Sequence, residues 1–187
     1  MEALVLSGLA MKLAKSSSPA SGAEHTVSHY LECYKLVRGI WPEFHGKKVG
    51  VATVLINRMY HNLAARVEDI TPRPDVIDWD ALAAAFTPEQ LEQVKELSKK
   101  MPIDKVKPER LREIFPEFRR LIEETLPSDE QLRGWMRRAG AVTEMEDVAV
   151  SPELLRDALR FHPYMRYRLM PTRVFGMMGL DILDYID

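Results

Sequence analysis

Two histidines, His25 and His29, stand four residues apart in a segment whose apolar residues follow a helical spacing. Residues four apart share one face of a helix, with their Cβ atoms about 6 Å apart. Two neutral imidazoles placed in this way often supply two of the ligands of a metal site. The spacing alone leaves open a polar helix face or a buried, hydrogen-bonded histidine. Thr26 stands where a zinc peptidase motif needs a glutamate, so that chemistry is excluded.

A third histidine, His45, directly precedes Gly46, where the longest apolar segment of the chain begins. A ring at a helix start lies near unpaired N–H groups, and the positive end of the helix keeps it neutral, as a metal requires. The alternative is an ordinary residue of the loop that starts the helix. His61 lies roughly 160° further around the same helix, so we expect it to be structural or on the surface. His162 precedes a proline and is also expected to be structural.

The segments that carry and position these residues are all predicted to be helices. Residues 46–67 contain enough β-branched side chains to suggest a strand, but their length without turn signals favours a buried helix. Helix-start signals recur at Thr87, Lys107, Ser128 and Ser151. A turn is expected at residues 16–22, a linker at 71–74, and no hairpin signal is found. The sequence therefore predicts an all-α bundle in one domain, 1–187, centred on the helix 46–67.

Composition narrows the class of protein. Lys and Arg number 26 and Asp and Glu number 28, a formal net charge of −2, which argues against nucleic-acid and anionic-membrane partners. Charged residues interrupt every apolar stretch before it is long enough to span a bilayer, and the N-terminal segment does not resemble a signal peptide. The single cysteine, Cys33, predicts a reducing compartment, the cytoplasm, and a buried inert thiol. Five arginines lie near the C-terminus, and we expect them on a solvated helix face or in an interface: Arg156, Arg160, Arg166, Arg168 and Arg173.

Two sequence blocks resemble a known family. Residues 18–30 read SPASGAEHTVSHY and residues 45–53 read HGKKVGVAT. They are similar to the two metal-ligand segments of sn-glycerol-1-phosphate dehydrogenases, in the iron-containing alcohol dehydrogenase and dehydroquinate synthase-like superfamily. The distance along the chain between His25 and His45 also fits that family. The resemblance is good up to about residue 60 and loose over residues 69–187.

The resemblance implies a metal- and substrate-binding helical domain. Members of the family hold one divalent metal, zinc or iron, with one Asp and two His, and the two His match His25 and His45. His29 matches a position that contacts the substrate. The metal polarises the alcohol oxygen and prepares hydride transfer to a nicotinamide cofactor, NAD(P). The complete enzyme interconverts dihydroxyacetone phosphate and glycerol 1-phosphate, so the implied substrate is a small polyol phosphate. We expect ring nitrogens of His25 and His45 to lie within roughly 3 to 5 Å of each other.

The sequence also departs from the family. It has nine glycines but no Gly-x-Gly-x-x-Gly motif after a strand, and no Asp precedes His25. We therefore expect the chain alone to be inactive and to bind Zn²⁺ or Fe²⁺ weakly. We expect it to contact NAD(P) only when a separate nucleotide-binding domain is present. The expected partner is a Rossmann-like subunit or a second copy covering the first two helices. The sequence leaves open a fragment, one product of a split gene, or a stand-alone relative. The alternative function is a non-catalytic helical protein-interaction module that retains the motif.

Overall fold

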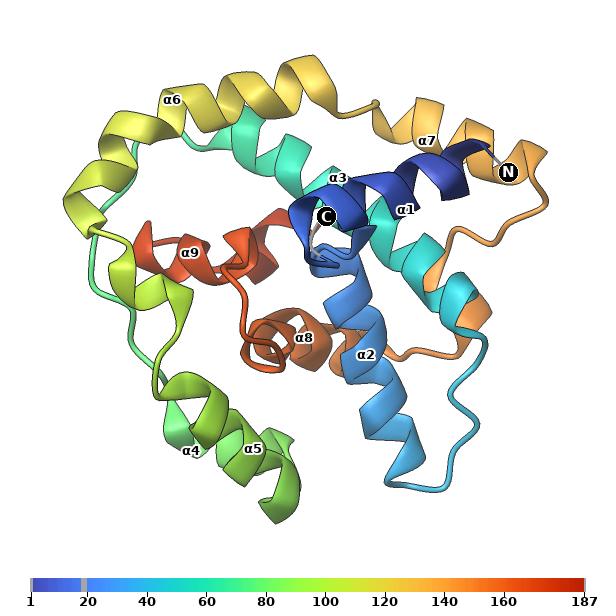
Figure 1. The fold of residues 1–187 in the computed structure, drawn as a ribbon, viewed down its shortest axis with the longest axis horizontal. Helices are drawn as coiled ribbons and strands as arrows, with labels where there is room; N and C mark the ends of the chain where they lie inside the picture. Colours follow the sequence, from blue (N-terminus) through green and yellow to red (C-terminus); the bar gives the residue numbers. More distant parts are fainter. Residues whose placement is uncertain (1, 18–19, 187) are drawn as a thin grey trace.

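The computed structural model of the chain describes residues 2–17 and 20–186 (Figure 1). Ser18 and Pro19, which belong to the predicted turn and to the first sequence block, lie outside the described residues, as do Met1 and Asp187. The α-helices are α1 (Glu2–Ala14), α2 (Ala23–Leu36), α3 (His45–Arg66), α4 (Trp79–Ala85), α5 (Pro88–Ser98), α6 (Pro108–Thr125), α7 (Asp129–Arg138), α8 (Pro152–Phe161) and α9 (Pro171–Met177). Short 3₁₀ helices are η2 (Pro102–Lys105), η3 (Met145–Val148), η4 (His162–Tyr164) and η5 (Ile182–Tyr185).

The predicted all-α class is confirmed, since the two described ranges contain helices and no strand. Helices begin at all four predicted start signals, and three of these form side-chain caps, whereas Lys107 does not. Thr87 and Ser128 each accept a hydrogen bond from the backbone amide three residues on, and a glutamine side chain returns the bond to complete a capping box. Ser151 caps α8 in the same way without the return bond. None of the described helices is long and apolar enough to cross a bilayer.

Helix α3 is the central element, as its apolar pattern predicts. Val51, Leu55, Met59 and Leu63 recur every four residues and are all buried. Because this helix is apolar on more than one side, it packs on α2, α6 and α7 together with η3 and η5. The buried apolar side chains form one cluster that runs from α2 to η5.

Helix α2 packs along α3 and ends where the sequence predicts (Figure 1). Gly39 adopts a left-handed conformation with φ of +67°, and the Ile40 amide donates to the carbonyl of Lys35 at 2.9 Å. This pairing closes the end of a helix and turns the chain away from its axis. The loop that follows returns the chain to α3.

The predicted linker is extended and fastened to α9. The amides of Thr71 and Arg73 donate to the carbonyls of Met178 and Met177 at 2.9 and 2.8 Å. Gly179, with φ of +81°, allows this approach, because a Cβ at that position would lie 2.9 Å from the Thr71 carbonyl oxygen. The linker therefore lies close to the C-terminal helices.

The expectation of a solvated arginine face is wrong for Arg173, which is 5% exposed and pairs with Asp75 of the linker at 2.6 Å. Sequence spacing could not reveal this, because the partner lies 98 residues away. His162 is structural, as expected: it is fully buried, and its Nδ1 donates to the Ala158 carbonyl while its Nε2 accepts from Thr172 Oγ1. His61 is also structural, because its Nε2 donates to the Pro127 carbonyl at 3.0 Å.

Candidate metal centre

Helix α2 carries a stripe of three metal-ligating residue types. His25, His29 and Glu32 occupy positions i, i+4 and i+7, which share one face of a helix. The neighbouring face buries Val27 and Leu31 in the core. The stripe is therefore half-buried at the edge of the α2–α3 contact, where its polar atoms remain accessible.

His45 is the first residue of α3 and faces this stripe. Its ring centroid lies 5.5 Å from that of His25 and 5.2 Å from that of His29. Its Nδ1 lies 3.3 Å from Ser28 Oγ and 3.6 Å from Glu32 Oε2. The structure thus brings together the three histidines that the sequence singles out, although they come from two helices that a loop separates in the sequence.

The loop before His45 is held by a buried lysine. Lys48 is 1% exposed, and its Nζ donates to the carbonyls of Pro42 and Glu43, both at 2.8 Å. Glu43 has a left-handed φ of 62°, which a residue with a side chain rarely adopts. The two bonds from Lys48 fix this turn and so fix the entry of the chain into α3. The same ammonium lies 3.6 Å from Glu32 Oε2 and balances its charge.

His25 is oriented by its neighbour Glu24. Glu24 Oε1 lies 2.9 Å from His25 Nδ1 and accepts from the Gly22 amide at 2.7 Å. Burial alone would raise the pKa of Glu24, but the hydrogen bonds from His25 and Gly22 outweigh it and lower that pKa. With the Nδ1 proton donated to a carboxylate, the Nε2 lone pair of His25 is free. Such carboxylate–histidine pairs are typical of metal-ligating histidines.

His29 is held in its neutral form. Burial lowers its pKa below the ordinary value, and the positive charge of Arg166 and the neighbouring His45 lower it further. A neutral imidazole keeps a lone pair for a metal or for a substrate hydroxyl. Arg166 is exposed and brings a positive charge to the same surface.

The donor set suits a divalent metal. The ligand atoms of His29, Glu32 and His45 all lie within 4.8 Å of one another. Tetrahedral ligands with bonds of about 2.1 Å stand about 3.4 Å apart, close to the separation between Glu32 and His45. Imidazole with carboxylate suits zinc and iron. Glu32 and Lys48 were missed from the sequence, although the i+7 spacing of Glu32 from His25 was a usable signal.

Cys33 is not part of this centre. Its thiol is half-buried, and burial raises its pKa above the ordinary value, so it is a poor metal ligand at neutral pH.

No protein-family model and no solved structure matches the chain. Curated relatives do match it, among them three proteins named glycerol-1-phosphate dehydrogenase [NAD(P)+]. The relative from Geobacillus stearothermophilus is 32% identical over 188 residues, covering 100% of this chain and 39% of the relative. The relative from Bacillus licheniformis is 28% identical over 180 residues, 96% of this chain and 34% of the relative. A shorter match, to Halalkalibacterium halodurans, is 52% identical over 65 residues.

The chain spans about a third of the length of these relatives. The two long alignments cover 96% and 100% of the chain, so both reach well into residues 75–187, where the sequence motifs indicate only a loose resemblance. The all-helical fold agrees with the part of the family that the two sequence blocks indicate. The chain is therefore similar in sequence to a C-terminal part of the relatives named glycerol-1-phosphate dehydrogenase [NAD(P)+].

Proposed function

We propose that the chain is the metal- and substrate-binding helical domain of a glycerol-1-phosphate dehydrogenase-like, NAD(P)-dependent polyol phosphate oxidoreductase of the cytoplasm. The observation that carries the proposal is that the His45 ring lies beside the rings of His25 and His29. The tightest set of donor atoms is His29, Glu32 and His45, with the His25 ring next to it. The names of the relatives support the reaction class. Alone, the domain does not catalyse the reaction, because a dinucleotide needs a nucleotide-binding domain as well.

Each residue of the centre has a proposed role. His25 and His45 hold the metal, Zn²⁺ or Fe²⁺, and Glu32 is a carboxylate within reach of His45. A bound divalent metal would polarise the alcohol oxygen of the substrate. Glu24 orients the His25 ring, and Lys48 fixes the loop that places His45.

His29 contacts the substrate in this proposal. Its neutral ring has a free lone pair or an N–H to offer a hydroxyl. Arg166 lies close enough to affect the pKa of His29. A guanidinium at this place suits a substrate that carries a phosphate.

Titration of the full chain with Zn²⁺ tests the metal centre by calorimetry. We expect one equivalent to bind weakly, and His25→Ala and His45→Ala each to weaken binding at least about tenfold, because each removes a ligand. His29→Ala should change the affinity much less. His61→Ala is the matched control, because the His61 ring is not a proposed ligand and donates to the Pro127 carbonyl instead.

Circular dichroism of each variant establishes that it is folded. Zn²⁺ affinity unchanged in both His25→Ala and His45→Ala would contradict the proposed ligands. If His29→Ala and Glu32→Gln abolish binding while His25→Ala does not, the metal is held by His29, Glu32 and His45 instead.

The second candidate is a non-catalytic protein-interaction module. It is favoured by α1, a helix with many apolar side chains and no buried residue. Absence of saturable Zn²⁺ binding, together with a stable complex through α1, would favour this function over the first.

A further inference from the structure

An apolar groove lies between α6 and α9. Its volume is about 220 Å³, and every residue that lines it has an apolar side chain. Val174, Phe175 and Met178 line it and are buried, whereas Ile114 and Leu169 are 46% and 44% exposed. A cavity without polar partners does not hold ordered water, so apolar side chains that fill it are stabilised there.

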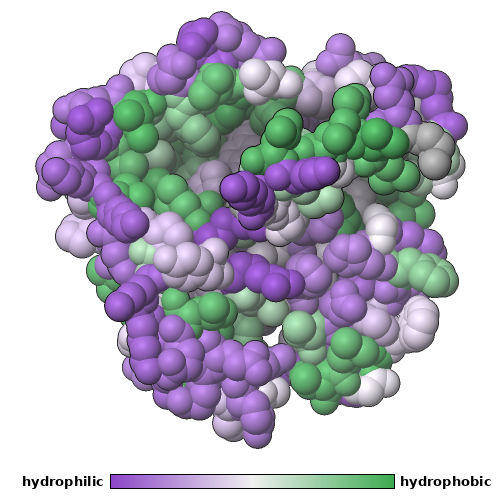
Figure 2. Space-filling view, in the orientation of Figure 1, coloured by the Kyte–Doolittle hydropathy of each residue, from purple (hydrophilic) through white to green (hydrophobic). Residues whose placement is uncertain are grey.

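The apolar face of α6 continues beyond the groove. Ile114, Phe118 and Leu121 are at positions i, i+4 and i+7, so they share one face of the helix. Leu121 is 45% exposed. Figure 2 shows apolar side chains gathered beside α6 on the face of the molecule that it draws. A groove of this kind binds a helix through apolar residues at positions such as i, i+3 and i+7.

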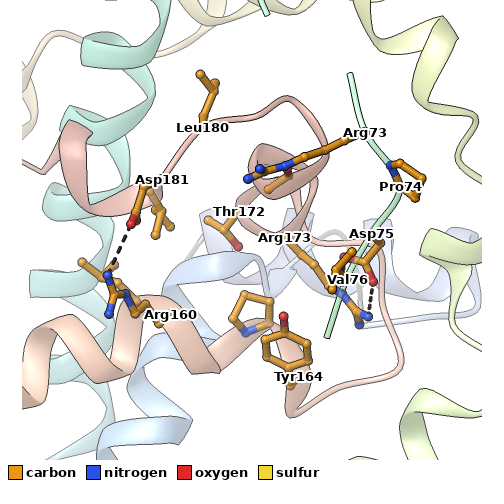
Figure 3. Close-up of a pocket in the computed structure, with 14 residues that line it drawn as sticks. Arg73, Pro74, Asp75, Val76, Arg160, Tyr164, Thr172, Arg173, Leu180 and Asp181 are labelled. Carbon is orange, nitrogen blue, oxygen red and sulfur yellow. Dashed lines mark hydrogen bonds and ion pairs between the residues drawn. The ribbon is translucent and has the colours of Figure 1, made fainter. Parts of the chain in front are cut away.

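Both walls of the groove are fixed to the rest of the molecule. Arg112 Nη2 donates to the carbonyl of Ile70 at 2.8 Å, which holds α6 to the segment after α3. Figure 3 shows how α9 is held to the linker, through the ion pair of Arg173 with Asp75 at 2.6 Å. Because the groove is already formed, its walls lose little conformational entropy when a helix binds.

Helix α1 has the properties that this groove requires. It carries no charged residue between Glu2 and Lys12, and none of its residues is buried. Leu6, Leu9 and Leu13 are at positions i, i+3 and i+7 and are 57%, 51% and 86% exposed. A helix that is apolar on all sides is normally buried. A groove covers more of such a helix than a flat surface does.

The turn after α1 directs this helix away from the groove of its own chain. Lys15 is left-handed, with φ of 48°, and the Ser16 amide donates to the Met11 carbonyl at 3.2 Å. This Schellman turn fixes the end of the helix. Arg168 donates to the Ser21 carbonyl and so holds the segment that follows. Figure 1 shows α1 running from this turn toward α7, in the opposite direction from α9.

We propose that α1 of one copy docks in the groove between α6 and α9 of a second copy, and that the exchange is mutual. At 1.5 Å per residue, α1 is about 20 Å long and α6 about 27 Å, so α6 can flank the whole of α1. A two-fold exchange makes the same contact twice. Each contact therefore needs to bury only about 800 Å² to reach the roughly 1,600 Å² of a stable interface.

Analytical ultracentrifugation of the full chain tests the proposal, with a chelator present so that no metal contributes. We expect a monomer–dimer equilibrium. Ile114→Glu should raise the dissociation constant of the dimer at least about tenfold, because the contact would bury an unpaired carboxylate. Val76→Glu is the matched control, an exposed apolar residue of the linker outside the groove. Circular dichroism establishes that both variants are folded.

Disulfide trapping shows which chains meet. Cys33→Ser removes the native thiol from every sample, one chain carries Leu9→Cys, and a second, tagged chain carries Ile114→Cys. On oxidation the mixture should form a cross-linked product of the two different chains. Leu9→Cys mixed with tagged Val76→Cys is the control and should form much less.

Four results would overturn the exchange. The first is a strict monomer at high micromolar concentration, and the second is an equal effect of Ile114→Glu and Val76→Glu on the dimer. The third is an equal yield of cross-linked product from the two mixtures. The fourth is a chain carrying both Leu9→Cys and Ile114→Cys that links only to itself, since α1 would then fill the groove of its own chain.

Discussion

The orientation of His25 depends on a single carboxylate. Glu24 folds back on the Gly22 amide, and a Cβ at Gly22 would lie only 2.6 Å from Glu24 Oε2. Glycine at this position therefore leaves the space that the carboxylate occupies. The carboxylate in turn sets which nitrogen of His25 is free to bind a metal.

Replacing Glu24 should weaken metal binding without unfolding the chain. We expect Glu24→Ala to lower Zn²⁺ affinity about 10- to 100-fold, because the residues that orient ligating histidines contribute by that factor. Calorimetric titration measures the change. Glu89→Ala is the matched control, since Glu89 is likewise an acidic residue in the first turn of a helix. Equal affinities for the two variants would show that Glu24 does not orient a metal ligand.

Residue types predicted part of the centre. The sequence singled out His25 and His29 by their i,i+4 spacing and His45 by its place at a helix start. It could not find Lys48, whose role arises from the folding of the 37–44 loop back onto its ammonium. A lysine in a helix normally indicates a solvated face, and only the tertiary contact reveals that this one is buried.

At the scale of elements, one buried histidine joins η4 to α9. Burial lowers the pKa of His162 to about 4, despite hydrogen bonds from its ring to backbone carbonyls. In the unfolded chain the pKa of histidine is about 6.5. Between pH 6.5 and 4 the unfolded chain therefore binds one more proton than the folded chain, so stability falls as the pH falls through this window.

We expect His162 to account for a loss of about 3 kcal/mol in the free energy of unfolding between pH 7 and 4. Urea unfolding of the metal-free chain across this range measures it. His162→Gln should show a shallower pH dependence, because glutamine does not titrate, whereas His61→Gln should retain the full slope. A His162→Gln curve parallel to that of the unmodified chain would contradict the assignment.

Most helices were predictable because their signals are local. Thr87, Ser128 and Ser151 cap helices through bonds to residues three positions on, which a sequence displays directly. The packing of the linker against α9 was not predictable. It depends on the ion pair between Arg173 and Asp75 and on the close approach of Gly179 to the Thr71 carbonyl. Both pairs are far apart in the sequence and have no local signal.

For the whole molecule, the absence of a sheet from residues 2–17 and 20–186 predicts the cofactor behaviour of the chain. A dinucleotide is held by a glycine-rich turn between a parallel strand and a helix. We therefore expect no saturable NADH binding by the full chain. Titration followed by NADH fluorescence is the measurement, and a dissociation constant below about 100 μM would be inconsistent with a helical domain that meets NAD(P) only through a partner.

One face of the molecule carries several apolar regions. Two of those that Figure 2 shows lie over α1 and below the end of α2. Leu9 and Leu13 share one face of α1 and are 51% and 86% exposed. Leu36 and Trp41, near the loop that leads to His45, are also exposed. The C-terminal helices pack on α2 but leave α1 without a buried residue.

A helix so apolar and so exposed is expected to be covered in solution, because large exposed apolar patches drive association. We predict that the chain forms a homo-oligomer, a two-fold dimer being the simplest closed form, or joins a partner chain through α1.

Light scattering across a concentration series should show a mass above that of a single chain, and this mass should fall with dilution. Leu9→Glu with Leu13→Glu should shift the mass to that of a monomer, because burying two carboxylates in an apolar contact is costly. Val76→Glu, at an equally exposed site on the linker, should leave the mass unchanged. A strict monomer at high micromolar concentration would contradict self-association, and an oligomer that persists in the α1 variant would place the contact elsewhere.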